Sequence, residues 1–96
     1  MLFRSTGKVI AIESLDPFPT KNGELYQKQV IIQYDEEFAN KIVTKTVPFI
    51  RKGMNEPPKV YCIEGQEVEI SYTIDSRQSE SGRWYVNLIA HRITPL

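Results

Sequence analysis

The sequence has little cysteine, little histidine and no excess of either charge, and each shortage excludes a class of protein. Its 96 residues contain one Cys and one His, with 12 Lys+Arg against 12 Asp+Glu and a formal net charge of 0 at pH 7. The lone thiol, Cys62, excludes an internal disulfide and a multi-cysteine zinc motif, so we expect a reducing, cytoplasmic compartment. A net charge of 0 argues against a protein that coats nucleic acid through bulk charge.

Long hydrophobic runs are also missing. Polar and charged residues interrupt the N-terminal segment from Arg4 to Lys8, which excludes a signal-peptide core. No window approaches the roughly 20 apolar residues that a membrane span needs, so we expect no membrane partner. A chain of this length, 41% hydrophobic and 25% charged, suits one globular domain over residues 1–96.

Side chains that would carry catalysis are scarce. Cys62 and His91 lie on different predicted elements, and no nucleophile-elbow motif is present. The 5 glycines are isolated from one another, so the sequence has no glycine-rich phosphate loop. Glu67, Glu69 and Asp75 share one strand face, which is typical of a solvated surface. We therefore expect no enzyme activity, no cofactor and no metal, with Cys62 as a small core residue.

Period-two alternation of apolar residues, by contrast, runs through most of the chain. It predicts five strands, over residues 8–13, 27–35, 41–50, 66–75 and 83–93. The two prolines of Asp16–Pro19 should end the first strand, because proline cannot donate to a β-ladder. Thr20–Gly23 then supplies turn residues, and Asp35, Glu36 and Glu37 should end the second strand.

The alternation also predicts which side chains share a face. One face is predicted on each of the second, fourth and fifth strands: Lys28, Val30, Ile32 and Tyr34; Val68, Ile70, Tyr72 and Ile74; and Trp84, Val86, Leu88 and Ala90. On the third strand two sets remain open as the inward face: Ile42, Thr44 and Thr46, or Val43, Lys45 and Val47. Pro48 indicates an edge or a bulge near the end of that strand.

The connections between the strands indicate the fold. Residues 51–65 contain Gly53, Pro57 and Pro58, which leave room for one short helical turn at most. The fourth and fifth strands should form a hairpin across the polar loop 76–82. Strand, long loop, hairpin, crossing connector and hairpin is the order of the OB-fold. We therefore predict an all-β, five-stranded OB-fold barrel with a short helical or irregular connector between the third and fourth strands.

Four short strings carry a resemblance to a known family: Thr6–Ile10, Gln27–Gln29, Ile74–Arg77 and Gly82–Tyr85. In this order they resemble a small bacterial and phage family of unknown function, whose fold is similar to that of single-stranded-DNA-binding proteins. The resemblance covers residues 6–93. It implies the same barrel and a single-stranded nucleic-acid partner.

The chain departs from this family at two positions where a flat ring could stack on a base. Val47 and Pro48 stand where many members have an aromatic residue and glycine, and His91 stands where a second tryptophan often occurs. Phe49 is then the nearest ring that could replace the first.

The net charge of zero is the sum of two sequence segments with opposite charge. Residues 38–55 carry four cations and no acid, and residues 60–76 carry four acids and no cation. An OB-fold normally binds its ligand across the second and third strands, between the first and last hairpin loops. The positive segment falls on that surface and supplies these candidate site residues: Lys41, Lys45, Phe49, Arg51 and Lys52. Lys45 is the strongest candidate, because a cation inside a strand needs water or a ligand.

Two loops flank the same surface and mix cations with rings. They add the candidates Lys21, Tyr26, Arg77, Arg83, Trp84 and, at the start of the last strand, Tyr85. In single-strand binders, bases stack on rings for about 1–3 kcal/mol each while cations contact phosphates. Trp84 has an alternative as a core or barrel-rim ring beside Val86 and Leu88, and Tyr85 has one as a cross-strand packing residue.

The sequence therefore predicts a module that binds single-stranded DNA, with RNA as an open alternative. The few cations predict weak binding by one chain, which a homo-oligomer would strengthen by multiplying contacts. The competing interpretation is a protein-interaction or assembly OB module without nucleic-acid binding, favoured by the zero net charge.

Overall fold

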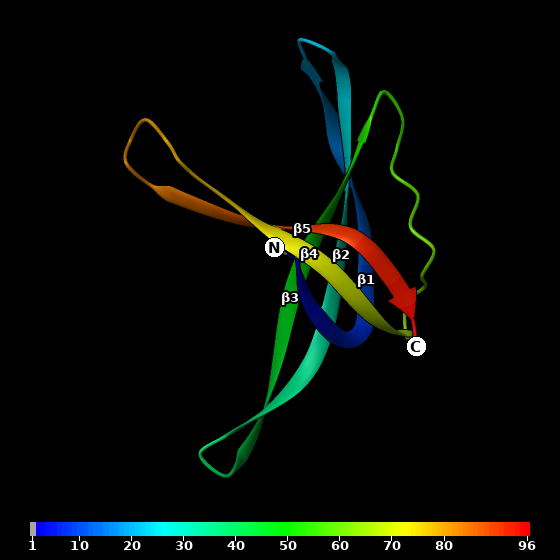
Figure 1. Ribbon diagram of the computed structural model, residues 1–96, viewed down its shortest axis with the longest axis vertical. Coiled ribbons are helices and arrows are strands. Elements are labelled where there is room, and N and C mark those ends of the chain that lie inside the picture. The colour runs from blue at the N-terminus through cyan, green and yellow to red at the C-terminus, as the bar shows by residue number, and fades with distance from the viewer. Residues whose placement is uncertain (1) are drawn as a thin grey trace.

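Five strands form a closed barrel in the computed structural model, which describes residues 2–96 (Figure 1). They are β1 (Phe3–Thr20), β2 (Gly23–Phe38), β3 (Lys41–Met54), β4 (Glu67–Gln78) and β5 (Trp84–Pro95). Their order around the barrel is β1-β2-β3-β5-β4, and β3 and β5 are the parallel pair. This topology confirms the predicted all-β OB-fold barrel. The described residues contain no helix that could cross a membrane.

The first strand closes the barrel by pairing on both sides. Phe3–Lys8 pairs with β4, and from Lys8 onward β1 pairs with β2. At Gly7 the backbone of β2 comes close, since a Cβ added there would lie 2.8 Å from the carbonyl oxygen of Gln33. Glycine at this corner therefore lets β1 pass from one neighbour to the other.

The core is small, and the faces that alternation predicts on β2, β4 and β5 supply most of it. Its buried residues are Val9, Val30, Ile32, Phe49, Cys62, Val68, Ile70 and Ala90. Val30 and Ile32 confirm the buried face of β2, Val68 and Ile70 that of β4, and Cys62 is a core residue as expected. On β3, Val47 and Phe49 pack in or against the core; of the two sets left open, Val47 alone is inward, and the other members of both sets are exposed.

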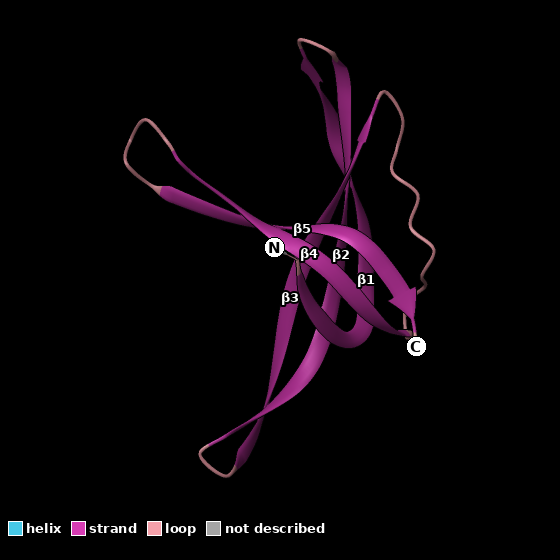
Figure 2. Cartoon of the chain, viewed as in Figure 1, coloured by secondary structure: helices cyan, strands magenta, loops and turns pink. Residues whose placement is uncertain are grey.

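Three β-hairpins extend beyond the barrel as arms (Figures 1 and 2). We name them the β1–β2 arm (residues 15–27), the β2–β3 arm (residues 34–46) and the β4–β5 arm (residues 75–87). Figure 1 shows them at the top, the bottom and the left of the view, respectively. Segments that the sequence analysis assigned to loops are therefore paired strands for most of their length.

The predicted end of the first strand at Asp16–Pro19 is wrong. β1 continues to Thr20, because a register shift between Leu15 and Phe18 takes Asp16 and Pro17 out of the ladder and pairing then resumes. A bulge is one of the places where a strand tolerates proline. The predicted turn is confirmed at Lys21 and Asn22, where the Thr20 hydroxyl donates to the Gly23 carbonyl at 2.7 Å.

The predicted break at Asp35, Glu36 and Glu37 is also wrong. β2 continues to Phe38, and the chain reverses through Ala39 and Asn40, whose φ angles are 52° and 63°. Two consecutive positive φ angles are typical of a type I′ turn, whose twist suits a two-residue hairpin. The acidic residues are tolerated in the strand because they are exposed on both faces.

The last strand follows its predicted face only inside the barrel. Ala90 is buried and Leu88 half-buried, but Trp84 and Val86 are 64% and 63% exposed because they lie on the β4–β5 arm. A bulge at His91 then changes the phase, since Ser71 pairs with Arg92 and Tyr72 with Ala90. Ile93 consequently packs against the core.

The connector between β3 and β4 is irregular and contains no helix. It runs along one side of the barrel (Figure 2) and inserts Cys62 into the core. The Arg51 guanidinium joins it to the barrel, donating to the carbonyl of Lys59 at 3.4 Å and to that of His91 at 2.6 Å. The irregular alternative for this connector is therefore the correct one.

Candidate nucleic-acid interface

The candidate site begins where β5 separates from β3. These strands pair at a single position, Ile50 with Ile89. Pro48, two residues earlier, has no N–H to donate to a neighbouring strand. The β4–β5 arm therefore diverges from β3 at this point, and the edge character predicted for Pro48 is confirmed on this side.

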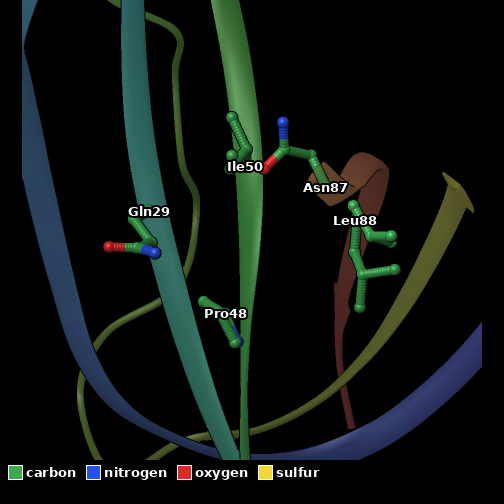
Figure 3. Close-up of a pocket in the computed structure, with 6 residues that line it drawn as sticks. Gln29, Pro48, Ile50, Asn87 and Leu88 are labelled. Atoms are coloured by element: carbon green, nitrogen blue, oxygen red, sulfur yellow. The ribbon is translucent and has the colours of Figure 1, made fainter. Parts of the chain in front are cut away.

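Two adjoining hollows lie where these strands diverge. We refer to the two hollows together as the groove. The apolar hollow has a volume of about 270 Å³ and is lined by Gln29, Pro48, Ile50, Val86, Asn87 and Leu88 (Figure 3). The charged hollow has a volume of about 420 Å³ and is lined by Phe18, Leu25, Gln27, Lys52, Asp75, Arg77, Tyr85, Val86 and Asn87. Val86 and Asn87 line both hollows, so the groove is continuous.

Three of the predicted site residues meet in the charged hollow. Lys52 comes from β3, Arg77 from β4 and Tyr85 from β5, and they are brought together because β3 and β5 are neighbours in the barrel. The Arg77 guanidinium lies 3.6 Å from the Asp75 carboxylate, the long end of an ion-pair distance. Tyr85 is 48% exposed, so much of its ring is free to contact a ligand.

The β1–β2 arm supplies the opposite wall of the charged hollow, as expected of a loop that flanks the ligand surface, but its residues Phe18 and Leu25 are not among the predicted site residues. Phe18 and Leu25 face each other across this arm as a cross-strand pair and are partly exposed. Phe18 lies between two prolines, a pattern that predicts a loop and gives no indication of a strand face. For the rest of the groove, the sequence does contain an indication: Gln27 and Gln29 give β2 a polar outer face.

Two predicted cations lie on another part of the molecule. Lys41 and Lys45 belong to the β2–β3 arm, and neither lines the groove. The Lys45 ammonium lies 2.8 Å from the Glu36 carboxylate, and that hydrogen-bonded partner raises the pKa of Lys45. Lys45 was the strongest candidate because a cation inside a strand needs water or a ligand. The ion pair with Glu36 within the arm explains its presence there.

Phe49 and Arg51 require a correction, because both point away from the outer surface. Phe49 is only 1% exposed and packs edge-on against Tyr72, with ring centroids 4.9 Å apart. Arg51 is on the same side of β3 and donates its guanidinium hydrogens to backbone carbonyls. Phe49 is thus a core residue rather than a stacking ring, and Arg51 ties β3 to β5 and the connector.

The remaining predicted residues lie on the arms outside the two hollows, where Tyr26 is half-buried and the others are exposed. Lys21 is in the turn of the β1–β2 arm, and Arg83 and Trp84 are near the end of the β4–β5 arm. The Tyr26 hydroxyl donates to the Glu24 carboxylate at 3.0 Å, and this contact raises the pKa of Tyr26. Trp84 is exposed, so the alternative of a core ring is wrong for it.

Within residues 2–96, no group of three or more His, Cys, Asp and Glu residues is placed to hold a metal ion. Burial raises the pKa of the Cys62 thiol, which keeps it in the protonated, poorly nucleophilic form.

The family model described as "Domain of unknown function (DUF3127)" matches residues 4–94. The chain belongs to this family. The match spans nearly the whole chain and confirms the resemblance read from the short sequence strings. No curated protein matches the chain.

Among solved structures, the chain is similar to the small single-stranded DNA-binding protein from Streptomyces coelicolor. The identity is 13% and the TM-score 0.52, with 100% of this chain and 94% of that chain covered. A likeness at this identity concerns the fold, and it agrees with the OB-fold assigned from the strand order.

Proposed function

We propose that this member of the family binds single-stranded DNA in the groove between the β1–β2 and β4–β5 arms. The observation that carries the proposal is the convergence of Lys52, Arg77 and Tyr85 in one open hollow. This hollow lies on the OB-fold surface on which single-stranded oligonucleotides are commonly bound. DNA is preferred over RNA because the similar solved structure is that of a single-stranded DNA-binding protein.

In this proposal each side chain of the charged hollow has a distinct part. Lys52 and Arg77 contact successive phosphates, and the Tyr85 ring stacks on a base, a contact worth about 1–3 kcal/mol. Asp75 opposes the phosphates and also draws on the Arg77 charge. Two cations and one nearby acid predict weak, salt-sensitive binding by a single chain. The protein acts by binding alone, without catalysis or a cofactor.

Charge substitutions test this proposal in both directions. In a fluorescence-anisotropy titration with an oligo-dT of about 15 nucleotides at low salt, Lys52→Glu and Arg77→Glu should each weaken binding about tenfold. Asp75→Asn should strengthen binding, because it removes a repulsive charge and releases Arg77. All three side chains are on the surface, so thermal denaturation should show folded proteins.

Lys45→Glu is the matched control, because Lys45 is an exposed lysine on the same strand as Lys52 but outside the groove. It should bind oligo-dT like the unaltered protein. Equal losses from Lys45→Glu and Lys52→Glu would contradict the proposed site. No binding at about 100 μM protein and low salt would favour the protein-interaction module instead.

A further inference from the structure

The apolar hollow differs chemically from the charged hollow beside it. Pro48 and Ile50 of β3 form its floor and Leu88 of β5 adds to its wall, while no charged side chain lines it. Its polar side chains are two carboxamides, Gln29 on β2 and Asn87 on β5. Figure 3 shows these amides on either side of Pro48 and Ile50, because β3 lies between β2 and β5 in the sheet.

Neither amide is committed to another part of the protein. Within residues 2–96, the side chains of Gln29 and Asn87 make no hydrogen bond to protein, whereas the Gln78 and Asn55 side chains do. Each free carboxamide offers one acceptor and an NH₂ donor. The hollow therefore combines an apolar floor with unused donor and acceptor pairs at two sides.

Such a site suits a ligand that has flat apolar faces and a polar edge, and a nucleobase is a ligand of this kind. We propose that the apolar hollow seats one unstacked purine base, whose edges are read by Gln29 and Asn87. The inference rests on the proposed function, because the charged hollow that would hold the adjacent phosphates shares Val86 and Asn87 with this one. A base in the apolar hollow would thus belong to the same strand as the phosphates at Lys52 and Arg77.

The preference for purines follows from the number of amide-compatible edges. An amide binds in a bidentate manner where a base places a donor next to an acceptor, as adenine does with its N6 amine and N7. Adenine has a second such pair at its N6 amine and N1, and guanine has two, at O6 and N1 and at its N2 amine and N3. A pyrimidine can satisfy one bidentate amide at a time, which would leave the other amide unpaired.

The test compares two oligonucleotides with equal numbers of phosphates, d(CA) and d(CT) repeats of about 12 nucleotides. Neither repeat pairs with itself, so the comparison isolates the base. The unaltered protein should bind the d(CA) repeat about tenfold more tightly. The double variant Gln29→Ala/Asn87→Ala should bind the two repeats with equal affinity, because neither amide remains to distinguish a purine from a pyrimidine, and its binding should stay salt-sensitive because Lys52 and Arg77 are unchanged.

Gln33→Ala is the matched control, since Gln33 lies on β2 outside both hollows and its loss should leave the tenfold preference intact. If the double variant is poorly folded, the side-chain NH₂ signals of Gln29 and Asn87 can be followed by NMR in the unaltered protein. The Gln29 signals should shift with the d(CA) repeat and stay in place with an abasic strand of equal length, because Gln29 lines the apolar hollow alone.

The outcomes separate this inference from the proposed function. Equal, salt-sensitive binding of both repeats would overturn the purine site while leaving the DNA-binding groove in place. A preference that survives the double variant, or Gln29 amide signals that shift equally with the abasic strand, would also overturn it. Failure to bind any oligonucleotide would overturn both proposals.

Discussion

At the scale of single residues, Arg51 stabilises the fold although its sequence position predicts a contact with a ligand. The backbones of β3 and β5 pair at one position, and the Arg51 guanidinium adds a contact to the carbonyl of His91 at 2.6 Å. His91 is the bulged residue of β5, so its carbonyl lies outside the regular β4–β5 ladder. A charge-assisted hydrogen bond there replaces backbone pairing.

We therefore expect Arg51→Met to destabilise the barrel. Hydrogen bonds to a charged group contribute about 1.5–3 kcal/mol, so the free energy of unfolding should fall by about 2 kcal/mol. For a domain of this size, this corresponds to a decrease in Tm of about 10 °C, measured by circular dichroism. Lys52→Met, one residue away on the outer face, should change the stability by less than about 0.5 kcal/mol. Similar Tm values for the two variants would contradict the role assigned to Arg51.

At the scale of elements, the three arms have different surroundings although all are paired hairpins. The β1–β2 and β4–β5 arms supply the walls of the groove, from Phe18 and Leu25 on one side to Arg77 and Tyr85 on the other. The β2–β3 arm extends to the opposite side of the view in Figure 1, and residues 35–46 are all exposed. Folding of the barrel and formation of the groove should therefore be independent of the tip of the β2–β3 arm.

Shortening the arms tests this division. Replacing residues 35–44 with Asn-Gly joins Tyr34 to Lys45, which are paired in the ladder, through a favourable two-residue turn. This variant should fold and bind oligo-dT as the full chain does. Replacing residues 77–85 with Asn-Gly joins the paired residues Ser76 and Val86 but removes Arg77 and Tyr85, so binding should be lost. If anisotropy shows that the first variant no longer binds, the ligand contacts the β2–β3 arm, and the assignment of the groove is contradicted.

Inside the barrel, the sequence predicts where most strands occur and which side chains face the core. It does not predict where the strands end. Val68 and Ile70 alternate with polar residues because one face of β4 packs on the core, and this is visible in sequence. The arms have little burial on either face, so alternation gives no signal there. Asp16 and Pro17 look like a strand end, but a bulge absorbs them and cross-strand pairing resumes. Such pairing depends on the partner strand, which the local sequence does not describe.

At the scale of the whole molecule, the formal net charge of 0 conceals an uneven distribution of ionic groups. The basic segment does not act as one surface: Lys41 and Lys45 lie on the β2–β3 arm, Arg51 contacts backbone carbonyls, and Lys52 alone of the four lines the groove. Arg77, which follows the acidic segment, provides the second groove cation. The groove therefore has only two cations in each chain that could contact phosphate.

This small number predicts the salt dependence of binding. With two phosphate contacts and about 0.7 counterions released for each on a single strand, log Kd should change with log salt by a slope of about 1.4. An oligomer that places several grooves on one strand should show a proportionally steeper slope and tighter binding. Anisotropy at several salt concentrations, combined with light scattering, measures both quantities. A slope near zero would contradict phosphate binding, and a steep slope from a monomer would contradict the assignment of Lys52 and Arg77 alone.

The sequence by itself determined the strand periodicity, the core faces of β2, β4 and the barrel part of β5, the order of elements and the family. These properties depend on local alternation and on short strings, so they can be read along the chain. The tertiary structure decided which cations and rings share a surface. Lys52, Arg77 and Tyr85 converge because β5 leaves β3 beyond a single paired position, while Lys45 pairs with Glu36 and Phe49 fills the core. Those outcomes depend on contacts between residues far apart in sequence, which alternation along one strand cannot specify.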